Sequence, residues 1–428
     1  MSDYAQSRRG ATIEPAYVNV YSVDKGAGRL EQAFVTLWMF IIYLPLEVFS
    51  PLRYLCILCF IGIMIYDHKR LLPLMFRSWP LFALAILGLL SVGWAPYPTE
   101  AMRQGILFFL SSFVAVVIAG HLTTQQALRV IMFAGMGTTL ASIPYWGDFQ
   151  WGGPYASKNY FAVHMLFCML LSLITVLNEK EPVFLRLLAL PFVPLCFVFL
   201  YMADSATSLV FAVLGAAGLA GIKFFWSPAT KVQGLSTLVI LFSLMAGLIL
   251  TLVVLNLPQN TFVERFLELV GKDATLTGRT SLWEGARLAA EQKPWFGLGL
   301  EGFWYYDSGA AQTLNENDFK AYGTKLTFHN AYLEVQVHLG YVGLALFLVF
   351  LGWTSLRMLY LWFQDGSLVN SALVLLIAVN LTMTFTESLL WGMFTTPVFL
   401  QALAGIAPFR LYDPKLEGRA RVTGRPQH

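Results

Sequence analysis

The sequence predicts an all-helical, polytopic integral membrane protein that crosses the bilayer about twelve times. Of its 428 residues, 57% are hydrophobic and only 12% are charged, and the mean hydropathy is +0.63. Soluble domains carry about 25% charged residues, so this chain lacks the polar groups needed to cover a water-facing surface. Its apolar runs approach the ~20 residues that an α-helix needs to cross a ~30 Å hydrocarbon core. Helices satisfy their own backbone hydrogen bonds in lipid, which makes them the natural spanning element.

Residues 1–31 form a polar segment ahead of the first apolar run. They include Arg8, Arg9, Lys25 and Arg29, and they show neither a short apolar core nor a small-residue cleavage site. This pattern does not fit a cleaved signal peptide. We therefore expect a cytoplasmic tail at 1–31 and a first membrane helix that itself directs insertion.

Charged residues, prolines and glycines divide the rest of the chain into apolar runs. Nine spans are predicted within residues 32–257 and three within 329–410: 32–50, 52–68, 79–95, 104–121, 126–145, 159–177, 184–203, 206–224, 235–257, 330–363, 367–388 and 393–410. A long loop, 258–328, separates the ninth span from the tenth. Residues 411–428 form a basic C-terminal tail.

The distribution of lysine and arginine predicts the orientation. With the N-terminus inside, eighteen of the 28 Lys and Arg residues lie in cytoplasmic segments and three in the short outer loops. Cytoplasmic loops carry such an excess in membrane proteins. Both termini are therefore expected in the cytoplasm, and the loop 258–328 on the outer side.

The loop 258–328 is predicted to be a structured cap on the outer face. One helical pattern runs over about 260–271 and another over about 279–291, where Lys293-Pro294 ends it. The stretch "PWFGLGLEGFWYY" then reads as a tight, irregular, aromatic segment. Polar low-complexity repeats, which would favour a linker, are absent from this sequence.

Three arginines of this loop are candidate ligands for an anion. Arg265 lies beside the membrane end of its predicted helix, Arg279 follows Gly278 at a helix start, and Arg287 lies further along the same helix. A cation at a helix N-terminus opposes the helix dipole, which is easier to explain if an anion is shared there. Helix amides with a guanidinium fork make a phosphate site. The alternative, that these arginines only solubilise exposed helices, stays open.

His329 is the candidate general base. It stands at the outer start of the tenth span, followed by Asn330, Tyr332 and Glu334. The dipole there disfavours a charged imidazole, and a general base must be neutral. The competing interpretation is a histidine that only hydrogen-bonds at a helix end. His338, nine residues later, fits packing or hydrogen bonding better and ranks second.

Another outer-face element is "SKNYFAVH", in which Lys158 and Asn159 open the sixth span. The lysine either extends its amine to the interface or adds charge to an anion site. Asp204 and Glu387 are acids near outer ends of spans. Acids within membrane segments are functional candidates, although helix-end solvation explains them equally well.

Several other site classes are disfavoured. The four cysteines lie inside apolar runs, so we infer neither a disulfide framework nor a redox centre from Cys56 and Cys59. The outer segments show no cluster with metal-ligand spacing, so no metal or cofactor is expected. With a net charge of +3, the chain gives no reason to expect nucleic-acid binding.

Two stretches resemble the O-antigen ligase family, within the wider group of O-antigen ligases and polymerases: "GRTSLWEGA…KPWFGLGLEGF" and "HNAYLEVQVHLGYVG". That family shows a His followed by Asn, Ser or Gln, nine residues, a Gly, two residues, then Gly, Thr or Tyr. Here His329-Asn330, residues 331–339, Gly340 and Gly343 match without a gap. "SKNYFA" is similar to the group's outer lysine-asparagine segment. The stretch "YMADSATSLV" lacks the arginine that relatives often carry, so that role falls to Arg265.

The resemblance implies a glycosyltransferase of the Gram-negative inner membrane with its active site in the periplasm. Its donor would be undecaprenyl-diphosphate-linked O-antigen, its acceptor lipid A–core oligosaccharide, and membrane lipids would surround it. We infer a metal-independent, inverting displacement. His329 is the base, and Arg279 and Arg265 stabilise the leaving diphosphate. The residues assigned to diphosphate or substrate binding are Lys158, Asn159, Trp283, Arg287, Asn330, Tyr332 and His338.

Three alternatives stay open. An O-antigen polymerase would use the same chemistry with a growing glycan as the acceptor, and a protein O-oligosaccharyltransferase would use a protein. From a different class, the chain could be a lipid or polysaccharide transporter. Transporters often repeat broken helices in two similar halves, and no such similarity is visible in this sequence.

Overall fold

The structure is a computed structural model in which residues 26–44, 46–155, 157–229, 232, 234–235 and 279–411 are described. In these ranges all regular elements are helices. Three predicted features lie outside the described residues: nearly all of the span 235–257, the loop helix 260–271, and Arg265.

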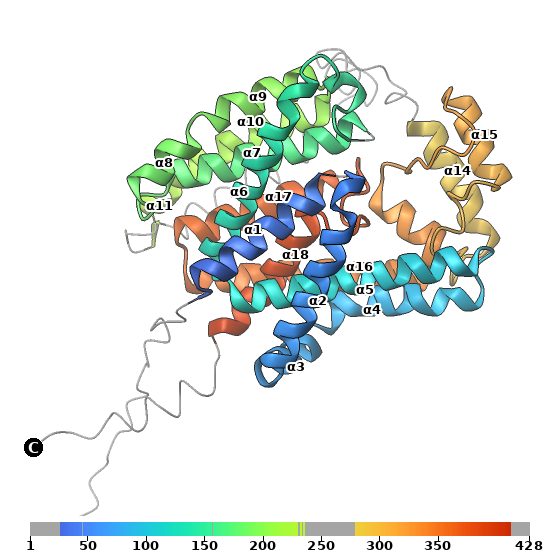
Figure 1. The fold of residues 1–428 in the computed structure, drawn as a ribbon, viewed down its shortest axis with the longest axis horizontal. Helices are drawn as coiled ribbons and strands as arrows, with labels where there is room; N and C mark the ends of the chain where they lie inside the picture. Colours follow the sequence, from blue (N-terminus) through green and yellow to red (C-terminus); the bar gives the residue numbers. More distant parts are fainter. Residues whose placement is uncertain are drawn as a thin grey trace, which may run out of the picture.

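The helices fall into three stretches of chain (Figure 1). The first contains α1 (Arg29–Tyr43), α2 (Ser50–Tyr66), α3 (His68–Arg77), α4 (Trp79–Leu90), α5 (Pro98–His121) and α6 (Thr124–Ser142). The second contains α7 (Lys158–Leu177), α8 (Val183–Ala189), α9 (Phe192–Met202), α10 (Ala206–Gly221) and α11 (Ser227–Ala229). The third contains α14 (Arg279–Gln292), α15 (Gly309–Asn317), α16 (Ala331–Gln364), α17 (Leu368–Met383) and α18 (Thr396–Ile406).

The all-helical, multi-pass membrane architecture expected from the sequence is confirmed. Among the described residues, seven helices are long and apolar enough to span a membrane, or eight if the bent pair α3–α4 counts as one span. That pair meets at an angle of 77°. Helices α17 and α18 are apolar but shorter. The count of twelve spans remains a prediction.

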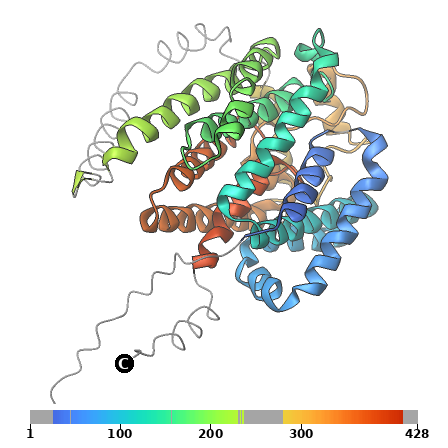
Figure 2. The same cartoon turned by 60° about the vertical axis from the view of Figure 1, so that its left-hand side comes forward.

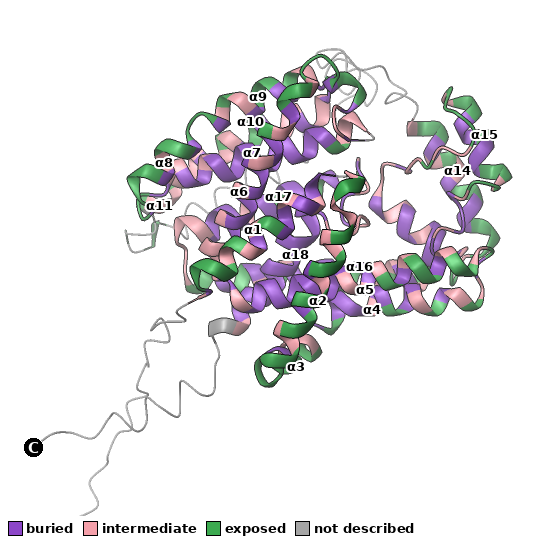
Figure 3. Ribbon diagram, viewed as in Figure 1, coloured by how far each residue is buried: buried purple, intermediate pink, exposed green. Residues whose placement is uncertain are grey.

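The two extremes of the bundle are α18 at its centre and α2 at its edge. All eleven residues of α18 are buried, whereas α2 buries only Cys56 and Phe60. In Figure 2 the blue N-terminal helices form one border of the bundle, and Figure 3 shows the buried residues concentrated in its interior. Exposed Leu55, Leu58 and Ile65 of α2 suit a surface that faces lipid.

Small residues and buried polar groups hold the helices together. Gly135 of α6 lies against Cys168 of α7, where a Cβ would have only 3.0 Å. In the core, Gln401 of α18 donates to the Thr354 hydroxyl of α16, and Asn380 Nδ2 donates to the Pro397 carbonyl over 3.0 Å. Close backbone approach and interhelical hydrogen bonds are the main attractions between helices in lipid, where burial of apolar surface adds little.

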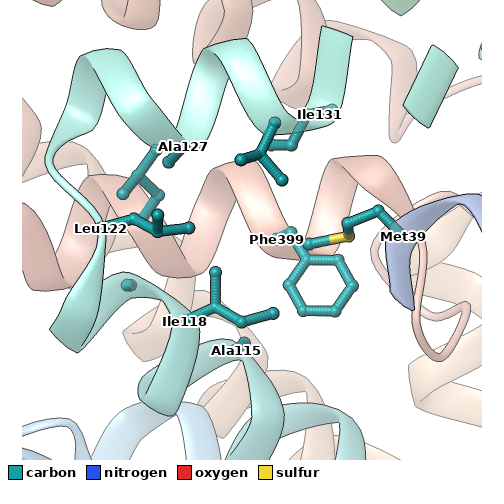
Figure 4. A pocket seen from close by; sticks show the side chains of 10 residues that line it. Met39, Ala115, Ile118, Leu122, Ala127, Ile131 and Phe399 are labelled. Atoms are coloured by element: carbon teal, nitrogen blue, oxygen red, sulfur yellow. The ribbon is translucent and has the colours of Figure 1, made fainter. Parts of the chain in front are cut away.

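The interior between α1, α5, α6 and α18 is nearly filled. A void of about 10 Å³ remains, lined only by apolar side chains such as Met39, Ile118 and Phe399 (Figure 4). An apolar space of this size neither attracts water nor holds a substrate. The core of the bundle is therefore scaffold, and a site for chemistry must lie elsewhere.

The predicted cap lies at one end of the bundle, where Figure 1 shows α14 and α15 together. It has a small core of its own, built around Leu282, Phe303, Trp304 and Phe328. The predicted helix 279–291 is confirmed as α14, and "PWFGLGLEGFWYY" is irregular as expected. The helix α15 was not predicted from the sequence.

A charged cluster ties the cap to the bundle. Lys325 Nζ lies 3.2 Å from both the Glu301 carboxylate in the cap and the Glu100 carboxylate at the start of α5. Partial burial alone would lower the pKa of Lys325, but the Glu301 and Glu100 carboxylates outweigh this and raise the pKa. The lysine therefore stays charged and links the two parts.

The tenth span is interrupted, which corrects the expectation of one continuous helix over 330–363. At Gly340 the backbone has φ 65° and ψ −163°, and α16 consists of two helical segments that meet there. The cap segment 294–299 fills the break. Leu298 N and Gly299 N donate to the carbonyls of residues 337 and 338, at 2.9 and 2.8 Å. The amides of residues 341 and 342 donate back to the carbonyls of 294 and 295, at 2.8 and 3.1 Å.

Gly340→Ala tests this arrangement. The φ/ψ values lie in a region that only glycine populates freely, and a Cβ at 340 would overlap the Trp295 carbonyl. We expect the variant to lose roughly 1–3 kcal/mol of folding free energy. The measurement is thermal unfolding in detergent. Gly62→Ala in α2 is the control, because nothing lies within 4 Å of its Cβ position. Equal unfolding temperatures for both variants would contradict the interpretation.

Candidate active site

Three charged or titratable side chains from distant parts of the chain meet where the cap joins the bundle. Glu387, in the segment after α17, lies between the other two. Its Oε1 is 2.7 Å from Nη2 of Arg279, and its Oε2 is 2.9 Å from Nδ1 of His329. The Glu387 side chain is 7% exposed, that of Arg279 13% and that of His329 24%. The group is therefore largely withdrawn from solvent, with the imidazole as its most accessible member.

This geometry determines the tautomer of His329. An ionised carboxylate only accepts hydrogen bonds, so Nδ1 must carry the proton that bonds to Glu387. In the neutral ring Nε2 is then the acceptor, and it is able to take a proton from a hydroxyl. A carboxylate that orients an imidazole in this way is the arrangement used to position a general base.

The backbone around His329 is held in an uncommon conformation. His329 has φ 49°, in the left-handed region. The next residue, Asn330, caps α16 by accepting from Tyr332 N at 3.0 Å and Leu333 N at 3.2 Å. Its Nδ2 donates to the Phe385 carbonyl at 3.3 Å. A side-chain N-cap followed by a regular helix places His329 outside the helix, where its ring turns toward Glu387.

Helix α14 positions the arginine. Arg279 and Trp283 are four residues apart, so they lie on the same face of α14. Arg279 bonds to Glu387, and the Trp283 indole donates to the Phe328 carbonyl at 2.9 Å. Phe328 itself is fully buried in the cap core. Helix α14 therefore contacts both Phe328, the residue before His329, and Glu387, the acid that binds His329.

Lys158 and Asn159 lie together at the start of α7, against the turn between α9 and α10. Lys158 Nζ is 3.2 Å from the Asp204 carbonyl and 3.4 Å from its carboxylate. Asn159 Oδ1 accepts from Ser205 at 3.3 Å. This turn belongs to "YMADSATSLV", the stretch without the family's arginine. A lysine from a neighbouring helix thus brings a cation to that stretch.

The structure separates the other predicted site residues. Arg287 lies on the exposed face of α14 and pairs with Glu284 at 2.9 Å, so it is not brought to His329. His338 is buried, as its second rank suggested, and its Nδ1 lies 3.1 Å from the Gly299 carbonyl. Tyr332 borders a groove between α16 and α17. Arg265 is outside the described residues.

Glu387 is the residue that sequence reasoning did not place in the site. It was noted only as an acid near the outer end of a span. It lies 58 residues from His329 and 108 from Arg279 in sequence, so no local spacing connects them. The one available signal was its type, because a carboxylate in an apolar segment needs a partner.

Residues 191–348 match the family described as O-antigen ligase. The exopolysaccharide production protein ExoQ of Rhizobium meliloti (strain 1021) is 27% identical over 300 residues. That alignment covers 66% of this chain and 66% of the relative, so it spans just under two thirds of the relative's length. This chain is therefore similar to proteins described as O-antigen ligases and to an exopolysaccharide production protein.

The family match covers only part of the site. The matched region includes Arg279, His329 and Gly340, and it ends at residue 348. Glu387 and Lys158 lie outside it. The contact between Glu387 and His329 was therefore found from the structure and not from the matched region.

Glu387→Gln tests the orientation of His329. Arg279 and His329 Nδ1 both donate to Glu387, and a glutamine offers an acceptor to only one of them. The ring would then favour the tautomer with Nε2 protonated, which is unable to act as the base. We expect kcat to fall by roughly 10²–10⁴-fold with little change in donor binding. Rates come from the transfer assay described below.

Glu284→Gln is the matched control, because it makes the same change in an exposed ion pair on α14. Its kcat should equal that of the unmodified protein. If Glu387→Gln kept a near-normal rate, Glu387 would not orient the base.

Proposed function

We propose that this protein is an O-antigen ligase, which transfers O-antigen from undecaprenyl diphosphate to lipid A–core oligosaccharide. The observation that carries the proposal is the contact of His329 with Glu387, itself paired with Arg279. This contact holds a proton on Nδ1, so that Nε2 is the nitrogen available to accept the hydroxyl proton. The match of residues 191–348 to the O-antigen ligase family supports glycan transfer as the reaction that uses it.

The step is a displacement at the anomeric carbon of the donor sugar. A hydroxyl oxygen of the acceptor forms a bond to that carbon, and the bond between the carbon and the diphosphate oxygen breaks. His329 Nε2 takes the hydroxyl proton, and undecaprenyl diphosphate leaves with the bonding electron pair. While His329 carries two protons, the Glu387 carboxylate stabilises its charge.

The leaving diphosphate gains negative charge, which cations placed in advance stabilise. Arg279 supplies a guanidinium at the site, although one of its donors is engaged by Glu387. Lys158 supplies an amine at the α9–α10 turn. Arg265 completes the set on the strength of the sequence alone. No metal ion is needed in this scheme, and we propose metal-independent transfer.

Direct displacement inverts the anomeric centre. A retaining route would need a carboxylate free to attack that carbon. Glu387 is the acid of this group, and its two oxygens are held by Arg279 and His329 while the side chain is 7% exposed. These contacts favour an orienting role for Glu387 and support inversion.

A groove beside the site suits the lipid tail of the donor. It has a volume of about 350 Å³ and opens between α16 and α17. Its lining residues are Tyr332, Leu348, Leu351, Gly352, Ser355, Leu381, Thr382 and Phe385. The Phe385 carbonyl accepts from Asn330, next to His329. A prenyl chain in this groove would present its diphosphate close to the base.

The placement in the cell follows from the charge distribution. The excess of lysine and arginine in the predicted cytoplasmic segments supports cytoplasmic termini and a periplasmic cap. We therefore propose the inner membrane of a Gram-negative bacterium, where both lipid-linked substrates would reach the site from the bilayer.

O-antigen polymerase is the second candidate. It is favoured by the relative ExoQ, whose name refers to exopolysaccharide production. The base, the leaving group and the groove would be the same. Only the acceptor would differ, since a growing lipid-linked glycan would replace lipid A–core.

The deciding experiment supplies purified protein with undecaprenyl-diphosphate-linked O-antigen and lipid A–core, with and without EDTA. Glycan joined to lipid A–core indicates a ligase, longer lipid-linked glycan a polymerase, and neither product an activity outside this class. We expect the first product, with equal rates in EDTA. His329→Ala should lower the rate by roughly 10²–10⁴-fold, because the base is lost. Donor binding should remain.

His68→Ala is the control for that variant, because His68 is exposed on α3. A His329→Ala variant that keeps near-normal transfer would contradict the assignment of the base. Activity that EDTA abolishes and Mg²⁺ or Mn²⁺ restores would contradict metal independence.

Gly352→Leu tests the groove. No atom lies within 4 Å of a Cβ at 352, so the new side chain enters the groove without disturbing the helix. We expect the donor KM to rise by about tenfold, which corresponds to roughly 1.4 kcal/mol of lost binding. The acceptor KM should not change. Gly62→Leu on the lipid-facing α2 is the control. An equal effect on a donor with a truncated tail would show that the groove does not hold the tail.

A further inference from the structure

A second buried acid, Glu334, lies one turn into α16. Its side chain is 1% exposed. Oε1 accepts from the backbone N–H of Phe328 at 2.6 Å and from the hydroxyl of Ser388 at 3.2 Å. Phe328 and Ser388 therefore bind the same carboxylate oxygen, which holds them close to each other.

The two donors are the chain neighbours of the two residues at the centre of the site. Phe328 immediately precedes His329, and Ser388 immediately follows Glu387. The two segments are far apart in sequence and belong to different parts of the fold. Among the contacts described, Glu334 touches neither His329 nor Glu387 directly. It binds the residue next to each of them.

His338 balances the charge of Glu334. Its Nε2 lies 3.5 Å from Glu334 Oε2, and its Nδ1 lies 3.1 Å from the Gly299 carbonyl. Both ring nitrogens face oxygen atoms, an arrangement that favours the doubly protonated, cationic ring. The ring also stacks on Trp391, with centroids 5.5 Å apart and planes at 14°. A buried carboxylate is tolerated when it has such a partner.

We propose that Glu334, supported by His338, is a positioning residue that sets the distance between His329 Nδ1 and Glu387. By holding residues 328 and 388 at one oxygen, it fixes the start of one segment relative to the other. His329 adopts φ 49°, which the local sequence does not favour by itself. A displacement of about 1 Å at a reacting group costs roughly 10²-fold in rate.

The expected effects on reaction rate rest on the proposed function. The expected effects on the contact between His329 and Glu387 do not. Ser388→Ala is the mildest probe, because it removes one hydroxyl and leaves the carboxylate in place. We expect kcat to fall by roughly 3- to 10-fold with unchanged KM for both substrates. Thr313→Ala, which removes an exposed hydroxyl bonded within α15, is the control and should match the unmodified protein.

Glu334→Gln keeps the acceptor oxygen and Glu334→Ala removes it, so the two variants together test whether this oxygen positions the site. The glutamine oxygen still accepts from residues 328 and 388 while its N–H₂ donates to a neutral His338, so activity should stay within about threefold. The alanine removes the acceptor, and kcat should fall by roughly 10²-fold. Alanine and glutamine variants of equal activity would overturn the proposal.

A double mutant tests whether Glu334 and Ser388 act through the His329–Glu387 contact. In a Glu387→Gln background the contact is already lost, so Ser388→Ala should cause no further fall in kcat. A purely structural defect would instead multiply with the Glu387→Gln loss. Multiplying losses would overturn the proposal.

Nuclear magnetic resonance of ¹⁵N-histidine-labelled protein tests the geometry without any activity. The His329 signal, identified by its loss in His329→Gln, should show a protonated Nδ1 in the unmodified protein and in Glu334→Gln. In Ser388→Ala the signal should shift toward exchange between tautomers. An unchanged signal in Ser388→Ala would overturn the positioning role of Glu334. If the protein makes no transfer product but shows these shifts, the proposed function is contradicted and the positioning role of Glu334 still holds.

Discussion

The break of α16 at Gly340 is the constraint on which the rest of the site depends. In an apolar environment a helix cannot leave backbone N–H and C=O groups without partners, because each one costs several kcal/mol. Here the segment 294–299 supplies them from both sides of the break. The cap is thereby fixed to the tenth span by backbone contacts, which do not depend on side-chain type. The first segment of α16 joins the two parts, because Leu333 and Val337 pack in the cap core while Val335 and Leu339 pack in the core of the bundle.

The polar groups of the site are arranged as pairs whose charges compensate one another. Glu387 is balanced by Arg279, and Glu334 lies against His338. Isolated charges on side chains this well buried would be strongly disfavoured, whereas paired and hydrogen-bonded charges are tolerated. One pair includes the acid that contacts His329, and the other binds the residues next to His329 and to that acid. The imidazole of His329 is the member left most accessible, as a group that must meet a substrate requires.

The sequence predicted the membrane class, which the structure confirms, as well as the helix 279–291 and the position of His329 at the start of the tenth span. Those conclusions rested on composition, on periodicity and on the spacing from His329 to Gly340, which are local properties. The contacts of Glu387 with His329 and Arg279 were not predicted, because they join positions far apart in sequence. Gly340 was noted for its spacing from His329, and the break there was not predicted, because whether a glycine packs or breaks a helix depends on the segment that approaches it. Arg287 resembled Arg279 in sequence, yet it lies on the exposed face of the same helix.

The proposed proton transfer would serve a ligase and a polymerase alike. The groups assigned to the proton transfer and to its orientation lie at the junction of cap and bundle, and they act on a hydroxyl and an anomeric carbon common to both reactions. The acceptor differs in everything beyond that hydroxyl. Aromatic residues such as Tyr306 and Tyr322, 57% and 61% exposed on the cap, lie outside this group. Acceptor choice can therefore vary through the exposed cap surface without disturbing the buried pairs, whereas a change in the pairs would affect every acceptor alike.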